Sequence, residues 1–480
     1  MNSAPTQGRP LLLAHSYYLR YDEKQTRKMK PYPPLGTLVT AALVRERGHD
    51  VALFDAMLAS GIDAFEAMLD DVRPSIVAMV EDNFNFLTKM CTLRMRRAAM
   101  DMIAAARLRG CRVVVNGSDA ADHPDAYLDG GANAVILGEP ELALCELIQA
   151  WEEDADADLA GITGLAIPAG RDGSGVRKTG LRTRLTDLDG LPFPAWDLVD
   201  VERYRATWTA AHGRLSWNMV TSRGCPYACN WCAKPIFGRR YAQRSPASVA
   251  EELRLLRDRV GPDHVWFADD IFGLTPAWIE AFAAEVTRRT ARTPFTIQSR
   301  VNLMKPPTVA ALAEAGAEEV WLGVESGSQK ILDAMEKGSR VDEARVATPA
   351  LKAHGIRSCW FIQLGYLGED WTDILLTREL VREQRPDEIG VSVSYPLPGT
   401  RFHELVRDQV GGKQNWEDTD DLAMLFHGTY ATDFYRRVRD LLHAEVDAGD
   451  GPTARRELDR RWAELEALEP ASRNAVSVDG

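Results

Sequence analysis

The amino-acid sequence predicts an α/β protein in which a doubly wound parallel sheet precedes a partial (β/α)6 TIM-type barrel and a small helical C-terminal region. Short apolar runs alternate with amphipathic stretches in two series, one from residue 10 to about 150 and one beginning at Trp217. Such alternation is typical of βα units, whose strands form parallel sheets. After about Gly411 the sequence becomes charged and keeps a helical period. At 480 residues, the chain is long enough for about three structural units.

The first series predicts a Rossmann-like domain with five strands. Between the first two strands, apolar residues from Leu35 to Leu43 recur at the spacing of one helix face, and Gly48 ends the helix. The helix before the fourth strand ends in the same way at Gly110. Domains of this kind bind ligands at the carboxyl ends of their strands. The expected strands are Pro10–Ala14, Val51–Phe54, Ser75–Val80, Cys111–Val115 and Asn133–Leu137.

Residues 161–205 are interpreted as a linker. Their periodicity is weak, and Arg171–Gly175 has the composition of a turn between two short strands. The stretch Leu191–Trp196 cannot be helical at its centre, because proline lacks the amide proton and restricts the residue before it. We therefore expect domains at 1–160 and 206–410, joined by this linker and followed by a helical region at 411–480.

The second series predicts six βα repeats. Repeats of this kind form a partial or complete barrel, whose chemistry takes place at the carboxyl ends of the strands. The expected strands are Trp217–Thr221, His264–Ala268, Phe295–Gln298, Glu319–Val324, Ser358–Leu364 and Glu388–Ser394. The clearest helical patterns are Pro246–Val260 and Pro276–Thr290, with Phe434–Val446 and Thr453–Leu468 in the C-terminal region.

Composition argues against several classes of protein. The chain has 57 Lys and Arg against 70 Asp and Glu, a formal net charge of −13, and phosphate backbones select basic surfaces. No run of 18 apolar residues occurs, and Leu11–Leu13 is too short for the apolar core of a signal peptide. We therefore expect a cytoplasmic protein with neither a membrane nor a nucleic-acid partner. The sequence makes no prediction about the oligomeric state.

Three of the seven cysteines lie within one short stretch. Cys225, Cys229 and Cys232 have the spacing C-x3-C-x2-C and directly follow a predicted strand. Three thiolates on one loop can hold three irons of a [4Fe–4S] cluster and leave the fourth iron for a non-protein ligand. Structural zinc needs four protein ligands, and the nearest histidine, His212, precedes the strand. Iron–sulfur is the favoured interpretation, and the alternatives are zinc and buried cysteines without a metal. We expect the other four cysteines to serve only in packing, because they lie on apolar helix or strand patterns. They are Cys91, Cys111, Cys145 and Cys359.

The cysteine loop resembles the signature of the radical S-adenosylmethionine (SAM) family, C-x3-C-x-Φ-C, with Trp231 at the aromatic position Φ. The extension Lys234–Tyr241 resembles the cobalamin-dependent, class B branch. This resemblance implies that the amino and carboxylate groups of SAM chelate the fourth iron. An electron from the cluster then cleaves the C5′–S bond, and the deoxyadenosyl radical abstracts a hydrogen atom from an unactivated carbon. It also implies a reductant such as flavodoxin or ferredoxin, and a small-molecule substrate.

The same resemblance implies SAM-binding residues at the ends of the second and third strands of the barrel. Asp269 or Asp270 would meet the amino group of SAM, although a helix N-cap pair is an equal alternative. Gln298 and Arg300 lie where relatives have a polar residue that meets the ribose or the carboxylate. Arg300 could instead be a solvated surface residue.

At the end of the fourth strand, Glu325 and Ser326 belong to the strongest of these matches, Gly323–Ser328. A carboxylate at an apolar strand end needs a partner, which a ribose hydroxyl or the SAM ammonium group would supply. A salt bridge to a neighbouring arginine is the alternative. Gly365 and the turn Tyr395–Thr400 would complete the mouth of the barrel.

The N-terminal domain lacks the G-x-G-x-x-G and P-loop fingerprints of nucleotide binding. Gly117 and Gly138 permit close backbone approach to a large flat ligand, although ordinary turn glycines would look the same. Ahead of a radical SAM barrel, however, this domain resembles the cobalamin-binding domain of class B methyltransferases. The implied cobalamin-binding residues are Pro34, Gly36, Asn83, Gly117, Ser118, Gly138 and Glu139.

Two departures from cobalamin-binding relatives matter. The D-x-H-x-x-G sequence that supplies a histidine to cobalt is absent, so we expect cobalt without a histidine ligand and with at most a side chain of the Glu81–Asn85 loop nearby. His15, His49 and His123 are not placed for ligation. Many relatives have a second glycine where this chain has Gly138–Glu141, which leaves the geometry of that loop open.

Taken together, these features predict a cobalamin-dependent radical SAM enzyme that methylates an unactivated sp3 carbon. One SAM would methylate cob(I)alamin, and a second would yield the deoxyadenosyl radical. The substrate radical that this species generates would then take the methyl group from methylcobalamin. A relative that performs ring contraction, cyclisation or another rearrangement is the alternative, and a methyl count on the product distinguishes the two. A cobalamin or metal sensor with a degenerate barrel is a remote alternative, which turnover of SAM to 5′-deoxyadenosine would exclude.

Overall fold

The computed structural model of the chain describes residues 10–85, 92–170, 175–234, 236–410, 412–413, 415–419, 421–448 and 451–474. It divides into two compact units. The first comprises Met1–Cys225, Lys234–Ala268 and Glu417–Asp420, and the second comprises Pro226–Ala233, Asp269–Trp416 and Asp421–Gly480. Cys91 lies outside the described residues, so its expected packing role stays a prediction.

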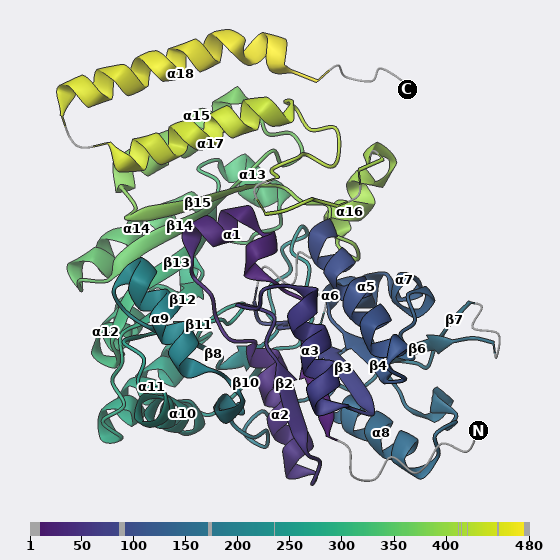
Figure 1. Cartoon of the computed structure of the whole chain (residues 1–480). Helices are drawn as coiled ribbons and strands as arrows, with labels where there is room; N and C mark the ends of the chain where they lie inside the picture. The colour runs from purple at the N-terminus through teal and green to yellow at the C-terminus, as the bar shows by residue number, and fades with distance from the viewer. Residues whose placement is uncertain are drawn as a thin grey trace. The chain divides into compact units, whose positions relative to one another are not determined.

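The first unit is built on a seven-stranded sheet of order β2-β1-β3-β4-β5-β6-β7 (Figure 1). Strands β1 to β5 pair in parallel, as predicted, while β6 and β7 extend the sheet by antiparallel pairing. These last two strands come from the segment interpreted as a linker. The strands are β1 (Leu11–Ala14), β2 (Val51–Phe54), β3 (Ile76–Val80), β4 (Arg112–Asn116), β5 (Ala134–Ile136), β6 (Leu165–Pro168) and β7 (Val176–Lys178).

Helices cover both faces of this sheet, which explains why β1 and β3 are apolar and buried throughout. Helix α2 packs with α8, and α3 packs with α5. Strand β1 lies between β2 and β3. The connection after β1 and the connection after β2 therefore run in opposite directions across the sheet, which creates a topological switch point at the carboxyl ends of the strands. The helices are η1 (Leu19–Tyr21), α1 (Glu23–Lys28), α2 (Leu35–Glu46), α3 (Ile62–Val72), α5 (Leu93–Leu108), α6 (Ser118–Asp122), α7 (Pro124–Asp129), α8 (Pro140–Glu153) and η2 (Leu159–Gly161).

The chain then enters a second sheet, of order β15-β14-β13-β12-β11-β8. Strands β8 (Ser216–Met219) and β11 (His264–Phe267) pair in parallel within the first unit. The short strands β9 (Ser222–Arg223) and β10 (Ala242–Gln243) form a separate antiparallel pair around the cysteine loop. The remaining helices of this stretch are η3 (Trp196–Leu198), α9 (Val201–His212) and α10 (Pro246–Arg259).

The second unit continues the βα alternation. Strands β12 (Phe295–Ser299), β13 (Ala317–Glu325), β14 (Arg357–Leu364) and β15 (Glu388–Val393) pair in parallel with their neighbours. All four lie within two residues of the expected bounds. The intervening helices are α11 (Pro276–Arg288), η4 (Val301–Leu303), α12 (Pro306–Ala315), α13 (Gln329–Ala334), α14 (Val341–Ala353), α15 (Trp371–Gln384), α16 (Arg401–Val406) and η5 (Arg407–Gln409).

The C-terminal region adds two long helices, α17 (Thr432–Asp447) and α18 (Pro452–Ser472), coloured yellow-green and yellow in Figure 1. Helix α17 packs on α15, and α18 packs on α17. Arg378 and Arg382 of α15 both pair with the buried Glu445 of α17 and with Asp459 of α18. This ion network attaches the helical pair to α15 within the second unit.

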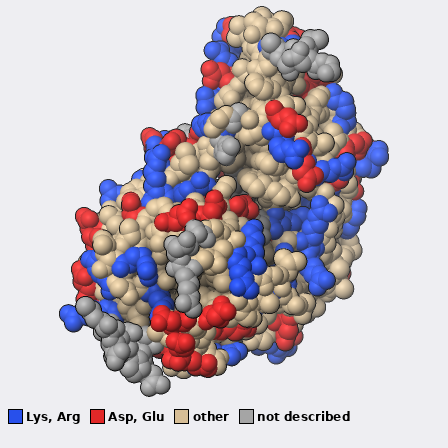
Figure 2. All heavy atoms as spheres, turned by 90° about the vertical axis from the view of Figure 1, so that its right-hand side faces the viewer, with Lys and Arg blue, Asp and Glu red and all other residues tan. Residues whose placement is uncertain are grey.

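Basic and acidic side chains are interspersed over the face of the molecule drawn in Figure 2. Neither sign of charge dominates that face. Among the described residues, no helix combines the length and apolar character that crossing a membrane requires.

Candidate active site

The cysteine loop begins with a glycine that the local backbone requires. Gly224 has a φ of +75°, and a Cβ there would lie 2.5 Å from the carbonyl oxygen of Arg240. No side chain fits such a position without displacing the chain. Next to it, the Cys225 N–H donates to the Gly238 carbonyl at 3.2 Å. The returning chain after the loop therefore fixes the first cysteine.

Asn230 anchors the rest of the loop within the second unit. Its backbone N–H donates to Met335 O at 3.0 Å, and its carbonyl accepts from Phe402 N at 3.0 Å. Its side-chain amide donates to Ala334 O at 2.9 Å and accepts from the Tyr366 hydroxyl at 2.8 Å. All four polar groups of this buried residue thus hold the loop between Cys229 and Cys232. Sequence reasoning missed Asn230, since its partners are more than 100 positions away.

Arg300, which follows β12, lies against the cysteine loop. Its Nη1 is 3.5 Å from Cys229 Sγ, its Nε donates to Asn302 Oδ1 at 3.1 Å, and its Nη2 donates to the Lys337 carbonyl. The guanidinium stacks 3.9 Å from the ring centroid of Tyr227. Arg300 is only 5% exposed, so its interpretation as a solvated surface residue is wrong.

Glu325 ends β13 in a conformation that is unusual for a residue with a side chain. Its φ is +66°, next to a register shift between β13 and β14. Such strain is found preferentially at functional sites. Its Oε1 accepts from Lys337 Nζ at 2.6 Å, and both side chains are buried. The alternative interpretation expected a salt bridge to an arginine, and the structure has a salt bridge to a lysine instead. Lys337 Nζ also lies 5.9 Å from the centroid of the Trp231 ring.

Two other predicted residues, Ser326 and Gln298, bond to turns and helices of the same unit. Ser326 is fully buried, with its Oγ 3.3 Å from Thr377 Oγ1 and accepting from Ser328 N at 3.1 Å. Gln298 is half-buried on β12, and its carbonyl accepts from Phe272 N at 2.9 Å. These bonds shape the turns that follow β13 and β11.

Asp269 and Asp270 follow β11 after one intervening residue, the former buried and the latter exposed. The alternative that they cap a helix is wrong. Helix α11 begins at Pro276, and Thr275 is its N-cap, accepting from Trp278 N at 3.4 Å. A loop of several residues separates the two aspartates from that helix, so capping does not explain their position.

Gly365 follows β14 with a φ of +75°, and a Cβ there would lie 2.8 Å from Met424 Cε. Its N–H donates to Glu369 Oε2 at 2.5 Å. Glu369 is fully buried, and burial raises the pKa of its carboxyl to about 8. Glu369 was not among the predicted site residues, although its place directly after the second glycine of a G-x-x-G turn could have identified it.

Four buried oxygen atoms at the carboxyl ends of β12, β14 and β15 have no hydrogen-bond partner within the described part of the chain. They are Ser299 Oγ, Gln363 Oε1, Glu369 Oε1 and Ser394 Oγ. Buried polar groups are almost always paired in native proteins. This edge of the second unit is therefore suited to a polar ligand.

In the first unit, the predicted loops bind one another at the carboxyl ends of β3 and β4. The Gly36 N–H donates to Asp82 Oδ1 at 3.1 Å, which ties the start of α2, after Pro34, to the β3 loop. Asn83 donates to Asn116 Oδ1 at 2.8 Å, and Asn116 donates in turn to the Gly138 carbonyl at 2.8 Å. Burial raises the pKa of the Asp82 carboxyl to about 6.

The two glycines expected to admit a flat ligand differ in their surroundings. A Cβ on Gly117 would lie 2.7 Å from Glu81 Cγ, so the stem of Glu81 occupies the space that this glycine leaves. Glu81 is held there by the Ser16 hydroxyl at 2.7 Å. A Cβ on Gly138 would have no atom within 4 Å, so this glycine faces open space. Ser118, which follows Gly117, is buried at the first position of α6.

Glu139 belongs to a buried ion triad that sequence reasoning did not foresee. Arg223 donates from Nη1 to Glu139 Oε1 at 2.8 Å and from Nη2 to Glu141 Oε1 at 2.5 Å. The other Glu139 oxygen accepts from Leu185 N at 2.7 Å. The guanidinium lies 5.5 Å from the ring of Phe84 and 5.3 Å from that of Phe237. The triad joins the β5 loop to the residue two positions before Cys225.

Comparison with known proteins identifies the middle of the chain. Residues 219–381 match the model of the radical SAM superfamily. The chain carries a radical SAM domain. An uncharacterized methyltransferase, PH0819 of Pyrococcus horikoshii, is 27% identical over 78% of this chain and 78% of its own length. Hopanoid C-3 methylase of Methylococcus capsulatus is 24% identical over 76% of this chain and 67% of its own length.

The fold extends this likeness beyond the radical SAM domain. The structure of the radical SAM methyltransferase TsrM from Kitasatospora setae, with cobalamin and a [4Fe–4S] cluster bound, matches 84% of this chain and 79% of its own with a TM-score of 0.68 at 20% identity. Both halves of the predicted architecture, the N-terminal doubly wound sheet and the second parallel sheet, are therefore confirmed as a fold.

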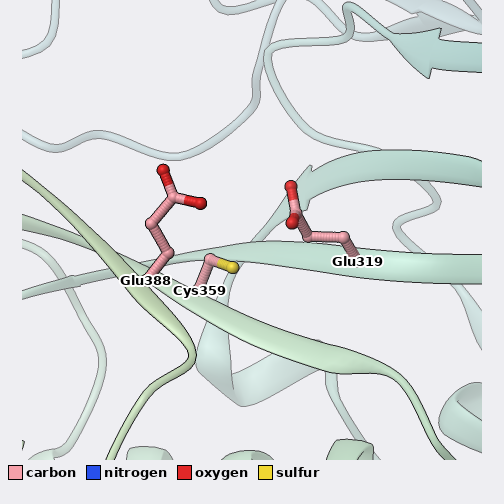
Figure 3. Close-up of side chains that lie close together, drawn as sticks. All are labelled: Glu319, Cys359 and Glu388. Atoms are coloured by element: carbon pink, nitrogen blue, oxygen red, sulfur yellow. The ribbon is translucent and has the colours of Figure 1, made fainter. Parts of the chain in front are cut away.

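A second group of metal-ligating side chains lies at the opposite end of the radical SAM domain's sheet, and its surroundings do not favour a metal. Figure 3 shows Cys359 between Glu319 and Glu388, near the amino ends of β14, β13 and β15. Arg357 pairs with both carboxylates, and Trp321 donates to Glu319 at 2.7 Å. Burial raises the pKa of the Cys359 thiol, which disfavours the thiolate that a metal needs.

The raised pKa of Glu369 predicts a pH dependence of stability in the radical SAM domain. Because the folded carboxyl titrates near 8 and the unfolded one near 4.5, the unfolded chain binds fewer protons between these values, and stability falls as the pH rises through this window. Glu369→Gln keeps an acceptor for Gly365 and removes the titration. We expect its Tm to exceed that of the wild type by several degrees at pH 9, at roughly 2 to 4 °C per kcal/mol, and by little at pH 5.

Calorimetry at both pH values measures this difference. Asp342→Asn, at an exposed position of α14, is the matched control and should shift Tm equally little at either pH. An equal Tm shift for Glu369→Gln at pH 5 and pH 9 would contradict the prediction.

Proposed function

We propose that this protein is a cobalamin-dependent radical SAM methyltransferase that acts on an unactivated sp3 carbon of a small molecule. The observation that carries the proposal is the C-x3-C-x2-C loop within a matched radical SAM domain, with the sulfur of Cys229 facing a buried guanidinium. A cationic donor at this sulfur complements the negative charge that an iron–sulfur cluster shares with its cysteine ligands. The methyltransferase relatives and the fold shared with TsrM support the same function.

Cys225, Cys229 and Cys232 would hold three irons of a [4Fe–4S] cluster. Gly224 allows the turn that leads into the loop, and the bonds of Asn230 hold its second half. SAM would occupy the edge where buried oxygens at the ends of β12, β14 and β15 have no partner in the described structure. When bound, SAM supplies a carbon-centred radical, and cobalamin supplies the methyl group.

Cobalamin would lie at the carboxyl edge of the first sheet. Gly138 offers open space there, and Asn83 and Asn116 are bonded to one another at the same edge. A cavity of about 320 Å3 in the same unit is lined by Tyr18, Tyr21 and the arginines 20, 94 and 97, and it has room for a polar arm of a large cofactor. The buried Tyr18 hydroxyl has no partner among the described residues.

The test is product analysis with anaerobically reconstituted protein, a strong one-electron reductant and SAM carrying a deuterated methyl group. We expect 5′-deoxyadenosine only when the cluster is loaded, and S-adenosylhomocysteine only when cobalamin is added. If 5′-deoxyadenosine formed without S-adenosylhomocysteine, the proposed reaction would be a rearrangement or cyclisation and not a methylation. The absence of both products from fully loaded protein would contradict an enzymatic role.

Cobalamin bound to this chain should carry no imidazole on cobalt. His15 lies just past β1, but its Nε2 is 2.9 Å from Asp55 Oδ1, and Tyr204 donates to the other oxygen of Asp55 at 2.7 Å. His49 lies before β2, 3.3 Å from Glu152, and His123 ends α6. Electron paramagnetic resonance of the cob(II)alamin form is expected to lack triplet nitrogen splitting. Splitting that disappears in His15→Gln would instead make His15 a ligand.

A further inference from the structure

Arg300 is held in place by the chain around it. Each of its three guanidinium nitrogens has an acceptor: Asn302 Oδ1, Cys229 Sγ and the Lys337 carbonyl. The ring of Tyr227 covers one face of the group at 3.9 Å. These contacts use three of the five N–H groups of the guanidinium and hold it against Cys229 and the Lys337 carbonyl, so it is not free to turn toward a SAM carboxylate.

We infer that Arg300 donates a hydrogen bond to the Cys229 thiolate and so raises the reduction potential of the [4Fe–4S] cluster, and that it does not bind the SAM carboxylate. The inference rests on the proposed function, because it requires a cluster on the three cysteines. Arg300 is thus a positioning residue that acts through a cluster ligand.

The charge balance of reduction gives the sign of the effect. One electron from a low-potential donor, such as a reduced flavodoxin or ferredoxin, converts the [4Fe–4S]2+ cluster to [4Fe–4S]+, and no proton or bond is exchanged. The added negative charge is shared with the cysteine sulfurs. A cationic donor at Cys229 Sγ stabilises the reduced state more than the oxidised one, and hydrogen bonds to the sulfurs are a known means of setting cluster potentials.

The surroundings of Arg300 make this effect strong. The side chain is buried, so water screens its charge poorly. Asn302, the Lys337 carbonyl and the Tyr227 ring fix the plane of the guanidinium. A lysine at position 300 would keep the charge but could not supply the planar fork that meets three acceptors.

The experiment is a redox titration of the reconstituted full-length protein without SAM, followed by electron paramagnetic resonance. We compare the wild type with Arg300→Met and Arg300→Lys. Arg357→Met is the matched control, because it removes the same charge near the amino end of β14. SAM binding to each variant is measured separately by equilibrium dialysis.

For Arg300→Met we expect the equilibrium constant for reduction to fall about tenfold, equivalent to about 59 mV for one electron. Arg300→Lys should lie between this variant and the wild type, and Arg357→Met should match the wild type. If Arg300→Met fails to load a cluster, a lowered potential in Arg300→Lys still supports the inference. Unchanged SAM-free potentials combined with weakened SAM binding would overturn it, and a wild type without a cluster would overturn the proposed function instead.

Discussion

Replacing Cys225, Cys229 or Cys232 by alanine is expected to remove the [4Fe–4S] cluster and with it all reductive cleavage of SAM. The loop supplies only three ligands, so the loss of one leaves an iron without a protein thiolate. Losing a residue that merely supports a metal ligand already costs about 10- to 100-fold in affinity or activity, and losing a ligand should cost more. Iron and sulfide content, together with the rate of 5′-deoxyadenosine formation, measure the effect.

The matched control is Cys145→Ala. Cys145 lies half-buried on α8, and burial raises the pKa of its thiol, so it is no ready iron ligand. Its replacement should leave both cluster content and SAM cleavage near wild-type values. Cluster content and activity retained in Cys229→Ala would contradict the assignment of the ligands.

Most strands could be predicted from the sequence, since buried parallel strands are continuous apolar runs bounded by turns. The edge strands β6 and β7 were expected only as short strands beside a turn. Their membership of the first sheet depends on the pairing of β6 with β5 and of β7 with β6, which no local pattern encodes. Helix α9 was not foreseen, because it buries only Tyr204 and Trp208 and so lacks a broad apolar stripe.

The site shows the same limit more sharply. The cysteine spacing is local and could be read directly from the sequence. The partners of those cysteines are not local, because Arg300 reaches Cys229 from 71 positions away and Asn230 is held by Tyr366 from 136. Glu325 needed a partner on energetic grounds, which was foreseen, but only the fold brings Lys337 to it. The functions of these residues toward SAM and cobalamin stay predictions.

Removing Arg223 is expected to have the largest effect on the stability of the first unit. Arg223→Met would leave Glu139 and Glu141 buried without their counter-charge, and Glu141 Oε2 already has no partner in the described structure. Breaking a buried ion pair at one partner costs about 3–5 kcal/mol. At roughly 2 to 4 °C per kcal/mol, we expect the Tm of the unit to fall by about 10 °C. Scanning calorimetry of the full chain measures this change.

A combined variant separates the loss of charge balance from the loss of packing. Arg223→Met with Glu139→Gln and Glu141→Gln removes all three charges, and buried ion groups replaced as a set by neutral residues often lose little stability. Most of the lost Tm should therefore return. Cluster content should be reduced in both variants, because these carboxylates hold Arg223 two residues before Cys225. Arg182→Met, which breaks a pair with the half-exposed Glu146, should change Tm by only a few degrees at most. If Arg223→Met were as stable as Arg182→Met, the triad would not be what joins the β5 loop to the cysteine loop.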